Sequence, residues 1–600
     1  MLRRTFGHVE FRGLQAPVIG EVLAGRSALA VLPTGGGKSL CYQIPSMMLP
    51  GLGLVVSPLI ALMSDQVSAL QQSGVAAARL DSTTDPDGRA ETWRRIEDGS
   101  LDLLYVSPEG LMQPWMLERL SQVRLALIAI DEAHGVSQWG HDFRPEYRSL
   151  GRLAEIFPDT PRLAVTATAD ARTRADIAAQ LRIEDAEVFV DSFARPELQL
   201  AAERKRGQGH NRVLELVAER PGRAGVVYAG SRDGVEKLAA KLVEAGTAAL
   251  PYHAGLDKAV RERRLRKFLD EDAAVMVATI AFGMGVDKPD VRYVIHADPP
   301  ASVEAYWQEV GRAGRDGLPA EGITLYGASD LAWALRRIGT RDLGPEVVQV
   351  QNRKVRQLYA MLDGMTCRAA AVRRYFGEAE AQACGVCDLC VAPPEAMDVT
   401  QAAQKALSAV HRLGGRFGRG RIVDHLLGKT KDPSPTEAAL STFGVGQELA
   451  VGGWRDLLDQ LTFEGLLLED PNDGRPLVML GEAEGVRAVY RGERRIRMRQ
   501  TEVQKSARRG AARQARTGGV GLAPADQPLF EALKAWRRRE AQAQGLPPYV
   551  IFHDRTLIEI ASLRPDDLTA LAACGGVGQG KLERYGAAVL QVLRDVAEAA

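Results

Sequence analysis

The most chemically informative stretch of this sequence is residues 32–39, in which three consecutive glycines precede Lys38 and Ser39. The apolar run 28–32 predicts a buried strand before them, and residues 40–44 can open a helix after them. Glycines let backbone N–H groups turn toward phosphates, while a lysine can reach the β- and γ-phosphates and a serine hydroxyl can ligate Mg²⁺. We therefore predict a phosphate-binding loop, and the alternative is a tight turn that merely favours glycine. The loop residues are Thr34, Gly35, Gly36, Gly37, Lys38 and Ser39.

A second candidate group is the acidic pair Asp131 and Glu132, which directly follows the apolar run 125–130. A carboxylate at a strand end can hold Mg²⁺, because this ion prefers oxygen ligands and keeps part of its hydration shell. A neighbouring glutamate can orient and deprotonate an attacking water. The alternative, a charged pair at a solvated strand end, is common for any Asp-Glu sequence.

Two arginines, Arg312 and Arg315, are spaced three residues apart in the stretch 308–317 and are expected on one helical face. Phosphoryl transfer depends mostly on positioning and charge stabilisation, so such guanidinium groups can act as arginine fingers. The sequence therefore predicts that a second structural unit completes the phosphate site.

Four of the six cysteines are clustered, and three of them follow a CxxCxxC spacing. Four thiolates form the complete tetrahedral shell of a structural Zn²⁺ site and leave no open position for catalysis. A disulfide is the weaker alternative, since a reducing compartment disfavours it. The predicted zinc ligands are Cys367, Cys384, Cys387 and Cys390.

These groups need a scaffold, and residues 1–340 alternate short apolar runs with helical patterns, which is typical of a parallel α/β sheet. In the first half, polar residues follow the apolar runs, and ligands bind beyond the carboxyl ends of strands in such sheets. The second half repeats the plan without a phosphate loop. The sequence thus predicts two similar α/β domains that share one nucleotide, with the expected strands at 28–32, 54–56, 103–106, 125–130 and 163–165, then at 226–228, 276–278 and 293–295.

The bulk composition sets broader limits. Six hundred residues predict several domains, and Lys+Arg and Asp+Glu number 76 each, so overall charge does not indicate a nucleic-acid binder. Residues 486–517 are locally basic, with eleven Lys/Arg against two Glu. This segment can neutralise phosphates or can serve as a solvated linker. No apolar run approaches the ~20 residues of a membrane span, so we expect a cytoplasmic enzyme with no membrane partner.

The combination of motifs resembles the RecQ family of DNA helicases within superfamily 2. The strings that carry the resemblance are residues 11–15, 33–43, 56–59, 131–134, 137–147, 166–168, 281–285 and 308–317.

The resemblance implies roles for particular residues at the nucleotide. Gln15 would recognise the adenine ring with Arg12 nearby, and Gln308 would join the nucleotide contacts. Family members usually carry tyrosine where His8 stands and Pro-Gly where Gly13 and Leu14 stand, so these positions depart from the pattern.

The resemblance also implies contacts to DNA. An aromatic-rich loop directly after the acidic pair would couple single-stranded DNA to hydrolysis, and stacking on aromatic rings suits that role; simple packing of these rings is the alternative. The expected contacts are Trp139, His141, Phe143 and Arg144 in the loop, together with Thr166 and Thr168.

The C-terminal half resembles the remaining RecQ modules. Two apolar runs around a turn signal predict a hairpin at 466–480, within a winged-helix domain in which Arg416 and Arg419 would approach duplex phosphates. Lys581 and Tyr585 follow a glycine-rich turn and would contact DNA in a small helical HRDC-like domain. Packing roles are the alternative for both residues.

The expected fold is therefore α/β, with two tandem RecA-like domains followed by a zinc-binding helical platform, a winged-helix domain and an all-α domain. The expected boundaries are 1–200, 201–340, 341–395, 396–485, a basic linker at 486–525, and 526–600.

The resemblance implies an ATP-, Mg²⁺- and Zn²⁺-dependent helicase that moves 3′→5′ on single-stranded DNA and unwinds duplex or fork DNA in recombination and repair. An RNA helicase, or an ATP-gated DNA-binding or annealing factor, remains the alternative. We further expect a monomer that is associated with the nucleoid if bacterial, and the family adds single-strand-binding protein as a partner.

Overall fold

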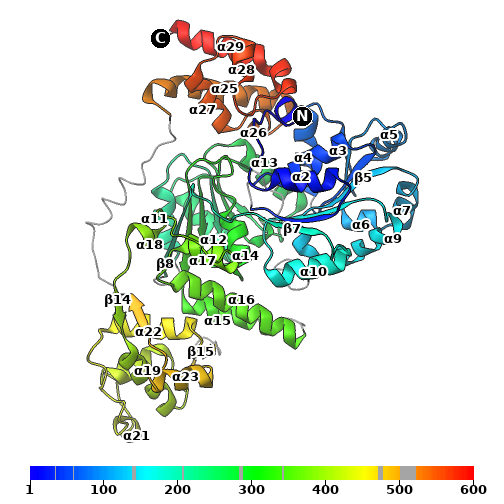
Figure 1. The fold of residues 1–600 in the computed structure, drawn as a ribbon. Helices are drawn as coiled ribbons and strands as arrows, with labels where there is room; N and C mark the ends of the chain where they lie inside the picture. Colours follow the sequence, from blue (N-terminus) through cyan, green and yellow to red (C-terminus); the bar gives the residue numbers. More distant parts are fainter. Residues whose placement is uncertain are drawn as a thin grey trace.

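The computed structural model describes residues 1–33, 36–58, 60–137, 144–205, 209–282, 288–340, 344–470, 477–499 and 522–599. Two α/β lobes form the centre of the molecule, a helical domain lies at one end beside the N-terminus, and a second small domain lies at the other end (Figure 1). Within the described ranges, no helix is both long and apolar enough to cross a membrane.

The first lobe is built on a seven-stranded parallel sheet in the order β3-β4-β2-β5-β6-β1-β7. All five strands expected in this half are present, because their continuous apolar runs are buried on both faces. The strands are β1 (Ala28–Val31), β2 (Leu52–Val56), β3 (Ala77–Leu80), β4 (Leu103–Val106), β5 (Leu125–Ile130), β6 (Arg162–Thr166) and β7 (Glu187–Val190).

Helices cover both faces of this sheet (Figure 1). Helix α3 begins directly after Ser39, as the apolar residues there predict. The helical segments are α1 (Leu2–Phe6), α2 (Gln15–Leu23), α3 (Leu40–Met48), α4 (Ile60–Gln72), α5 (Pro86–Glu97), α6 (Pro108–Leu111), α7 (Pro114–Leu120), η1 (Ala133–Val136), α8 (Pro145–Arg148), η2 (Ser149–Arg152), α9 (Leu153–Ile156) and α10 (Ala171–Leu181).

The second lobe repeats the architecture with a six-stranded parallel sheet in the order β10-β11-β9-β12-β13-β8. The three strands predicted here are confirmed. Its elements are β8 (Leu198–Arg204), α11 (His210–Ala218), β9 (Gly225–Tyr228), α12 (Arg232–Glu244), β10 (Ala249–Tyr252), α13 (Lys258–Asp270), β11 (Val275–Ala278), η3 (Ile280–Phe282), β12 (Tyr293–His296), α14 (Val303–Val310) and β13 (Ala320–Tyr326).

A helical platform continues from the second lobe and packs against the segment that joins the lobes. The rings of Phe193 and Phe376 stack with centroids 4.1 Å apart, and the Glu378 carboxylate accepts a hydrogen bond from the Phe193 N–H. Its helices are α15 (Ala328–Gly339), α16 (Pro345–Asp363), α17 (Arg368–Tyr375) and α18 (Asp388–Val391).

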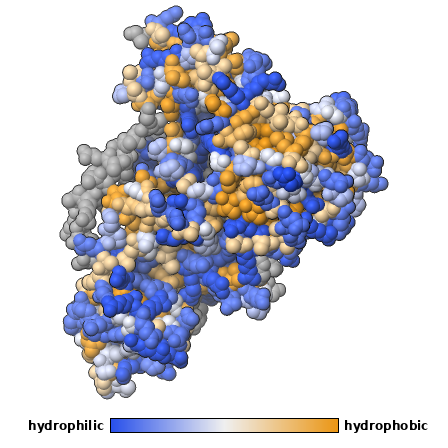
Figure 2. Space-filling view, in the orientation of Figure 1, coloured by the Kyte–Doolittle hydropathy of each residue, from blue (hydrophilic) through white to orange (hydrophobic). Residues whose placement is uncertain are grey.

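The next domain has its own apolar core around Trp454, which is fully buried. The predicted hairpin is confirmed, since β15 and β16 pair antiparallel; its connecting residues 471–476 lie outside the described ranges. The visible face of this domain is largely hydrophilic, whereas apolar side chains gather over the first lobe (Figure 2). Its elements are β14 (Ala396–Asp398), α19 (Thr400–Arg412), α20 (Arg419–Leu426), α21 (Pro435–Ala438), α22 (Val451–Phe463), β15 (Leu467–Asp470), β16 (Leu477–Leu480), α23 (Ala483–Tyr490) and β17 (Arg497–Arg499).

The C-terminal domain is all-helical and has a separate core that includes Trp536, Phe552 and Tyr585. It lies against both lobes (Figure 1), as described below. Its elements are η5 (Pro524–Asp526), α25 (Gln527–Gln544), α26 (Pro548–Ile551), α27 (Asp554–Leu563), α28 (Leu568–Ala572) and α29 (Gln579–Ala599).

Candidate functional site

A cavity of about 540 Å³ lies where the two lobes face each other. The first lobe contributes predicted phosphate-loop and acidic residues, and the second lobe contributes the predicted arginines. The sequence-predicted residues that line it are Arg12, Gly37, Lys38, Ser39, Asp131, Glu132, Gln308, Arg312 and Arg315. Residues more than 250 positions apart in the chain are therefore brought to one site.

The phosphate loop depends on glycine at position 37. Gly37 has φ +70°, and a Cβ atom there would lie 2.4 Å from Nε2 of Gln15. That amide donates hydrogen bonds to the carbonyl oxygens of Gly36 and Gly37, at 2.8 and 3.1 Å. Gln15 therefore braces the loop in this structure, although the resemblance assigns it to adenine. Two loop residues, Thr34 and Gly35, lie outside the described ranges.

The acidic pair sits at the carboxyl end of β5, in the centre of the first sheet. Burial and the neighbouring charge of Glu132 raise the pKa of Asp131 to about 7, although Lys38 and His134 oppose this shift. Glu132 adopts a left-handed backbone conformation with φ 49°, which is unusual for a residue other than glycine. Such conformations persist where the surrounding structure enforces them, and they cluster at functional sites.

The arginine pair differs from the expectation in one respect. Helix α14 ends at Val310, so Arg312 and Arg315 lie in the turns after the helix and not on its face. The helix is capped at Gly311, and the turns that follow pass through Gly314 at φ +69°, a conformation that glycine adopts without strain. The guanidinium of Arg195, in the segment that joins the lobes, donates to the carbonyl oxygens of Ala313 and Gly314 and so fixes these turns.

His134 connects the acidic pair to the end of the adjacent strand β6. Its Nδ1 lies 3.0 Å from the hydroxyl of Thr166 and 3.3 Å from a carboxylate oxygen of Glu132. Thr166 and Thr168, predicted as DNA contacts, are both buried and thus do not present a DNA-accessible surface in this structure. Thr166 links β6 to the acidic pair through His134.

The other predicted DNA contacts differ in exposure and in pairing, and some lie outside the described ranges. Trp139, His141 and Phe143 lie outside the described ranges, whereas Arg144 is half-buried and donates its backbone N–H to the carbonyl of Gly135. In the domain that contains the hairpin, Arg416 is exposed. Arg419 is ion-paired with Asp459 and Glu469, so the protein itself already compensates its charge.

Neither of the two C-terminal candidates is fully exposed to solvent. Tyr585 is buried in the core of its domain, and its hydroxyl lies 3.0 Å from the side-chain oxygens of both Gln72 and Gln544. Lys581 lies over the ring of Phe552, and burial lowers its pKa to about 8. The difference arises because this face of the domain packs against the first lobe, which the sequence alone does not reveal.

Part of the cavity wall comes from residues that the sequence does not indicate. Six residues of the C-terminal domain line the same cavity as Lys38 and Arg315, and no motif in the sequence connects them to it. They are His553, Arg555, Thr556, Glu559, Gly575 and Gly576.

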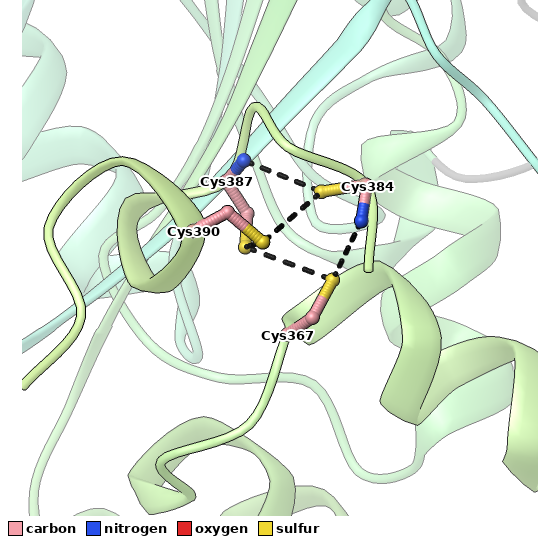
Figure 3. Close-up of side chains that lie close together, drawn as sticks. All are labelled: Cys367, Cys384, Cys387 and Cys390. Carbon is pink, nitrogen blue, oxygen red and sulfur yellow. Dashed lines mark hydrogen bonds between the residues drawn. The ribbon is translucent and has the colours of Figure 1, made fainter. Parts of the chain in front are cut away.

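The four predicted zinc ligands converge between α17 and α18 (Figure 3). Their sulfur atoms all lie within 4.8 Å of one another, and three of the separations are 3.5, 3.9 and 4.0 Å. Tetrahedral zinc with Zn–S bonds of about 2.3 Å requires sulfur separations of about 3.8 Å. Despite burial, which opposes the shift, the backbone N–H groups of Ala370 and Cys384 help to lower the pKa of Cys367 to about 7. The four residues therefore fit a structural zinc ion.

Comparison with protein families divides the chain into five matched regions. They are a DEAD/DEAH box helicase domain at 12–177, a helicase conserved C-terminal domain at 209–317, a RecQ zinc-binding region at 328–391, an RQC domain at 393–507 and an HRDC domain at 526–593. The first two coincide with the lobes that form the cavity, and the third contains the four cysteines.

Curated relatives match over nearly the whole chain. The ATP-dependent DNA helicase RecQ of Haemophilus influenzae is 37% identical over 597 residues, which cover 99% of this chain and 95% of the relative. The protein of the same name from Bacillus subtilis is 36% identical over 601 residues, covering 99% and 98%. With the cavity, the cysteine cluster and all five domains in agreement, this chain belongs to the RecQ family.

Proposed function

We propose that this protein is an ATP-dependent DNA helicase that moves 3′→5′ along one strand and unwinds the duplex ahead of it, in recombination and repair. The observation that carries the proposal is the cavity between the lobes, which combines a phosphate loop, an acidic pair and two arginines. The RecQ relatives that match this chain over nearly their full length are named DNA helicases, which supports DNA as the substrate.

Each lobe has a distinct part in the proposed hydrolysis. Lys38 binds the β- and γ-phosphates, and Glu132 orients the attacking water and accepts its proton. Ser39 and Asp131 hold Mg²⁺, which neutralises charge on the phosphates when bound. Arg312 and Arg315 stabilise the charge that develops in the transition state. Because the arginines belong to the second lobe, hydrolysis depends on the relative position of the lobes, and ATP and ADP can favour different positions.

The proposed DNA path involves two regions that are far apart in the chain. The aromatic loop around residues 138–143 would stack on single-stranded DNA, and the exposed Arg416 would approach duplex phosphates. We further propose that the protein is a monomer, that it associates with the nucleoid if bacterial, and that it contacts single-strand-binding protein.

A strand-displacement assay on forked DNA tests the function. We expect separation of a 3′-tailed fork in the presence of Mg²⁺ and ATP, and little separation of a 5′-tailed duplex. Equal activity on both tails would contradict the polarity, and stronger stimulation of ATPase activity by matched RNA would favour an RNA helicase. Annealing or binding without displacement would favour an ATP-gated DNA-binding factor.

Replacement of His134 by alanine is expected to lower the kcat of DNA-stimulated ATP hydrolysis by about tenfold while changing the KM for ATP less than twofold. The reason is that the ring lies between Glu132 and Thr166 and does not line the cavity itself. Steady-state kinetics measures both parameters, and His411→Ala, at an exposed position on α19, is the control. An unchanged kcat would show that this link is dispensable.

A further inference from the structure

The cavity between the lobes has a third wall that neither lobe provides. The start of α27 and the turn at Gly575 and Gly576, both in the C-terminal domain, line it together with Lys38 and Arg315. Figure 1 shows this domain beside the N-terminal helix and the first lobe. The C-terminal domain thus covers part of the cavity between the lobes, although no motif in its sequence indicates this.

The first lobe holds the C-terminal domain through close backbone contacts that leave no room for a side chain at position 7. Gly576 donates its N–H to the carbonyl of Gly7 at 3.0 Å. A Cβ atom at Gly7 would lie 2.8 Å from the backbone nitrogens of Val577 and Gly578. Real Cβ atoms do not approach so closely, so glycine at position 7 permits the contact. On the other side of the turn, Arg584 and Tyr585 both contact the side-chain oxygen of Gln72 at the end of α4.

The second lobe holds the same domain through charge. Asp272, which follows α13, pairs with Lys534 and Arg538 of α25. Despite partial burial, these cations and their neighbours lower the pKa of Asp272. The domain is therefore anchored to both lobes, across the cleft in which the nucleotide is proposed to bind.

Arg555 is the residue of this wall best suited to meet a nucleotide. Its side chain is exposed and lines the cavity from the first turn of α27. A Cβ atom at Gly317, two residues after Arg315, would lie 3.3 Å from its Nη1. On the opposite side, burial and the charges of Arg12, Lys581 and Arg555 lower the pKa of His8. Arg555 thus lies between the two lobes, with positive charge around it.

We propose that the C-terminal domain forms the third wall of the nucleotide site and that the Arg555 guanidinium contacts the phosphate groups of the bound nucleotide. This inference rests on the nucleotide site proposed above. Because linkage is reciprocal, a nucleotide that contacts Arg555 also stabilises the docked position of the domain. The face that carries Lys581 and Arg584 is then held against the first lobe while nucleotide is bound.

Binding of a fluorescent ADP analogue to the full chain, without DNA, tests this inference. Arg555→Ala is expected to raise the Kd by about threefold to tenfold, the loss of one partly exposed charge-assisted contact. Arg594→Ala, at an exposed position on α29, is the matched control and should leave the Kd within about twofold of the unchanged protein. Circular dichroism and the melting temperature verify that both variants are folded.

A second variant separates docking from direct contact. Asp272→Arg repels Lys534 and Arg538 without touching the cavity that holds Lys38, and it should also raise the Kd. Once the domain is displaced, Arg555 has no nucleotide to contact. The Kd of the double variant should therefore not exceed the higher of the two Kd values of the single variants.

Three outcomes would overturn the inference: an Arg555→Ala protein that binds like Arg594→Ala, an Asp272→Arg protein with unchanged Kd, or fully additive effects in the double variant. Lys38→Ala distinguishes this failure from failure of the nucleotide site itself. If Lys38→Ala loses nucleotide and Arg555→Ala does not, the site stands and only the third wall is refuted. If Lys38→Ala binds normally, the proposed site is wrong.

Discussion

Replacement of Lys38 by alanine is expected to reduce DNA-stimulated ATP hydrolysis by about a hundredfold to a thousandfold. This is the range for the loss of one preorganised group that stabilises charge in the transition state. Lys38 lines the cavity beside Ser39 and opposite the arginines of the second lobe. Its position directly after the glycine loop lets its ammonium group follow the phosphates through the reaction. Phosphate release, measured with saturating single-stranded DNA, gives the size of the effect.

DNA affinity is the internal control for this variant. None of the predicted DNA contacts that the structure describes lines the cavity, so the Kd for single-stranded DNA should change little. Lys237→Ala removes an exposed lysine on α12 that pairs with Asp233, and it should retain full hydrolysis. Turnover by Lys38→Ala close to that of Lys237→Ala would refute the assignment of the phosphate loop.

Replacement of Cys387 by serine is expected to reduce the zinc content from about one ion per chain to almost none, because a structural site needs all four ligands. Cys387 is buried, and its sulfur lies 3.5 Å from that of Cys390 and 3.9 Å from that of Cys367 (Figure 3). Zinc-dependent folding contributes roughly 10 kcal/mol in small metal-binding domains, so the segment around residues 364–395 should become sensitive to proteases. Elemental analysis and limited proteolysis measure the two effects.

The consequences of zinc loss should extend to the edge of the second lobe's sheet. Asp388, next to Cys387, holds the buried Arg368 through two contacts at 2.6 and 2.8 Å and also accepts the N–H of Ala202 in β8. Chelation of zinc in the unchanged protein should produce the same protease pattern. Cys574→Ala, in the C-terminal core, should keep its zinc. Full zinc occupancy in Cys387→Ser would contradict the four-thiolate site.

Much of the central fold follows from local sequence. The expected strands are present because their apolar runs are long enough to be buried on both faces of a parallel sheet. The sequence does not predict strands such as β7 and β8, because two of the four residues of β7 are exposed and β8 is not a continuous apolar run. Their identity as strands depends on partners that are distant in the chain, namely β1 for β7 and β13 for β8.

A glycine-rich turn is recognisable in the sequence, but its spacing does not identify the group that accepts its backbone N–H. The sequence predicts DNA contacts directly after the glycine-rich turn near residue 576, and in the structure Gly576 of this turn donates its N–H to the carbonyl oxygen of Gly7. A free N–H group at a turn has the same chemistry for either acceptor. Only the folded chain shows which acceptor is close.

The sequence by itself determined the chemistry of this protein: a glycine loop with Lys38, an acidic pair, two arginines and four thiols are recognisable because each function requires particular side chains at short spacings. The tertiary structure alone decided how separate regions share that chemistry, from the brace of Gln15 on the loop to the third wall that carries Arg555. The physical reason is that contacts between domains depend on surface shape and charge contributed by residues hundreds of positions apart. Such surfaces leave no periodicity or spacing in the chain, so folding must bring them together before they can be seen.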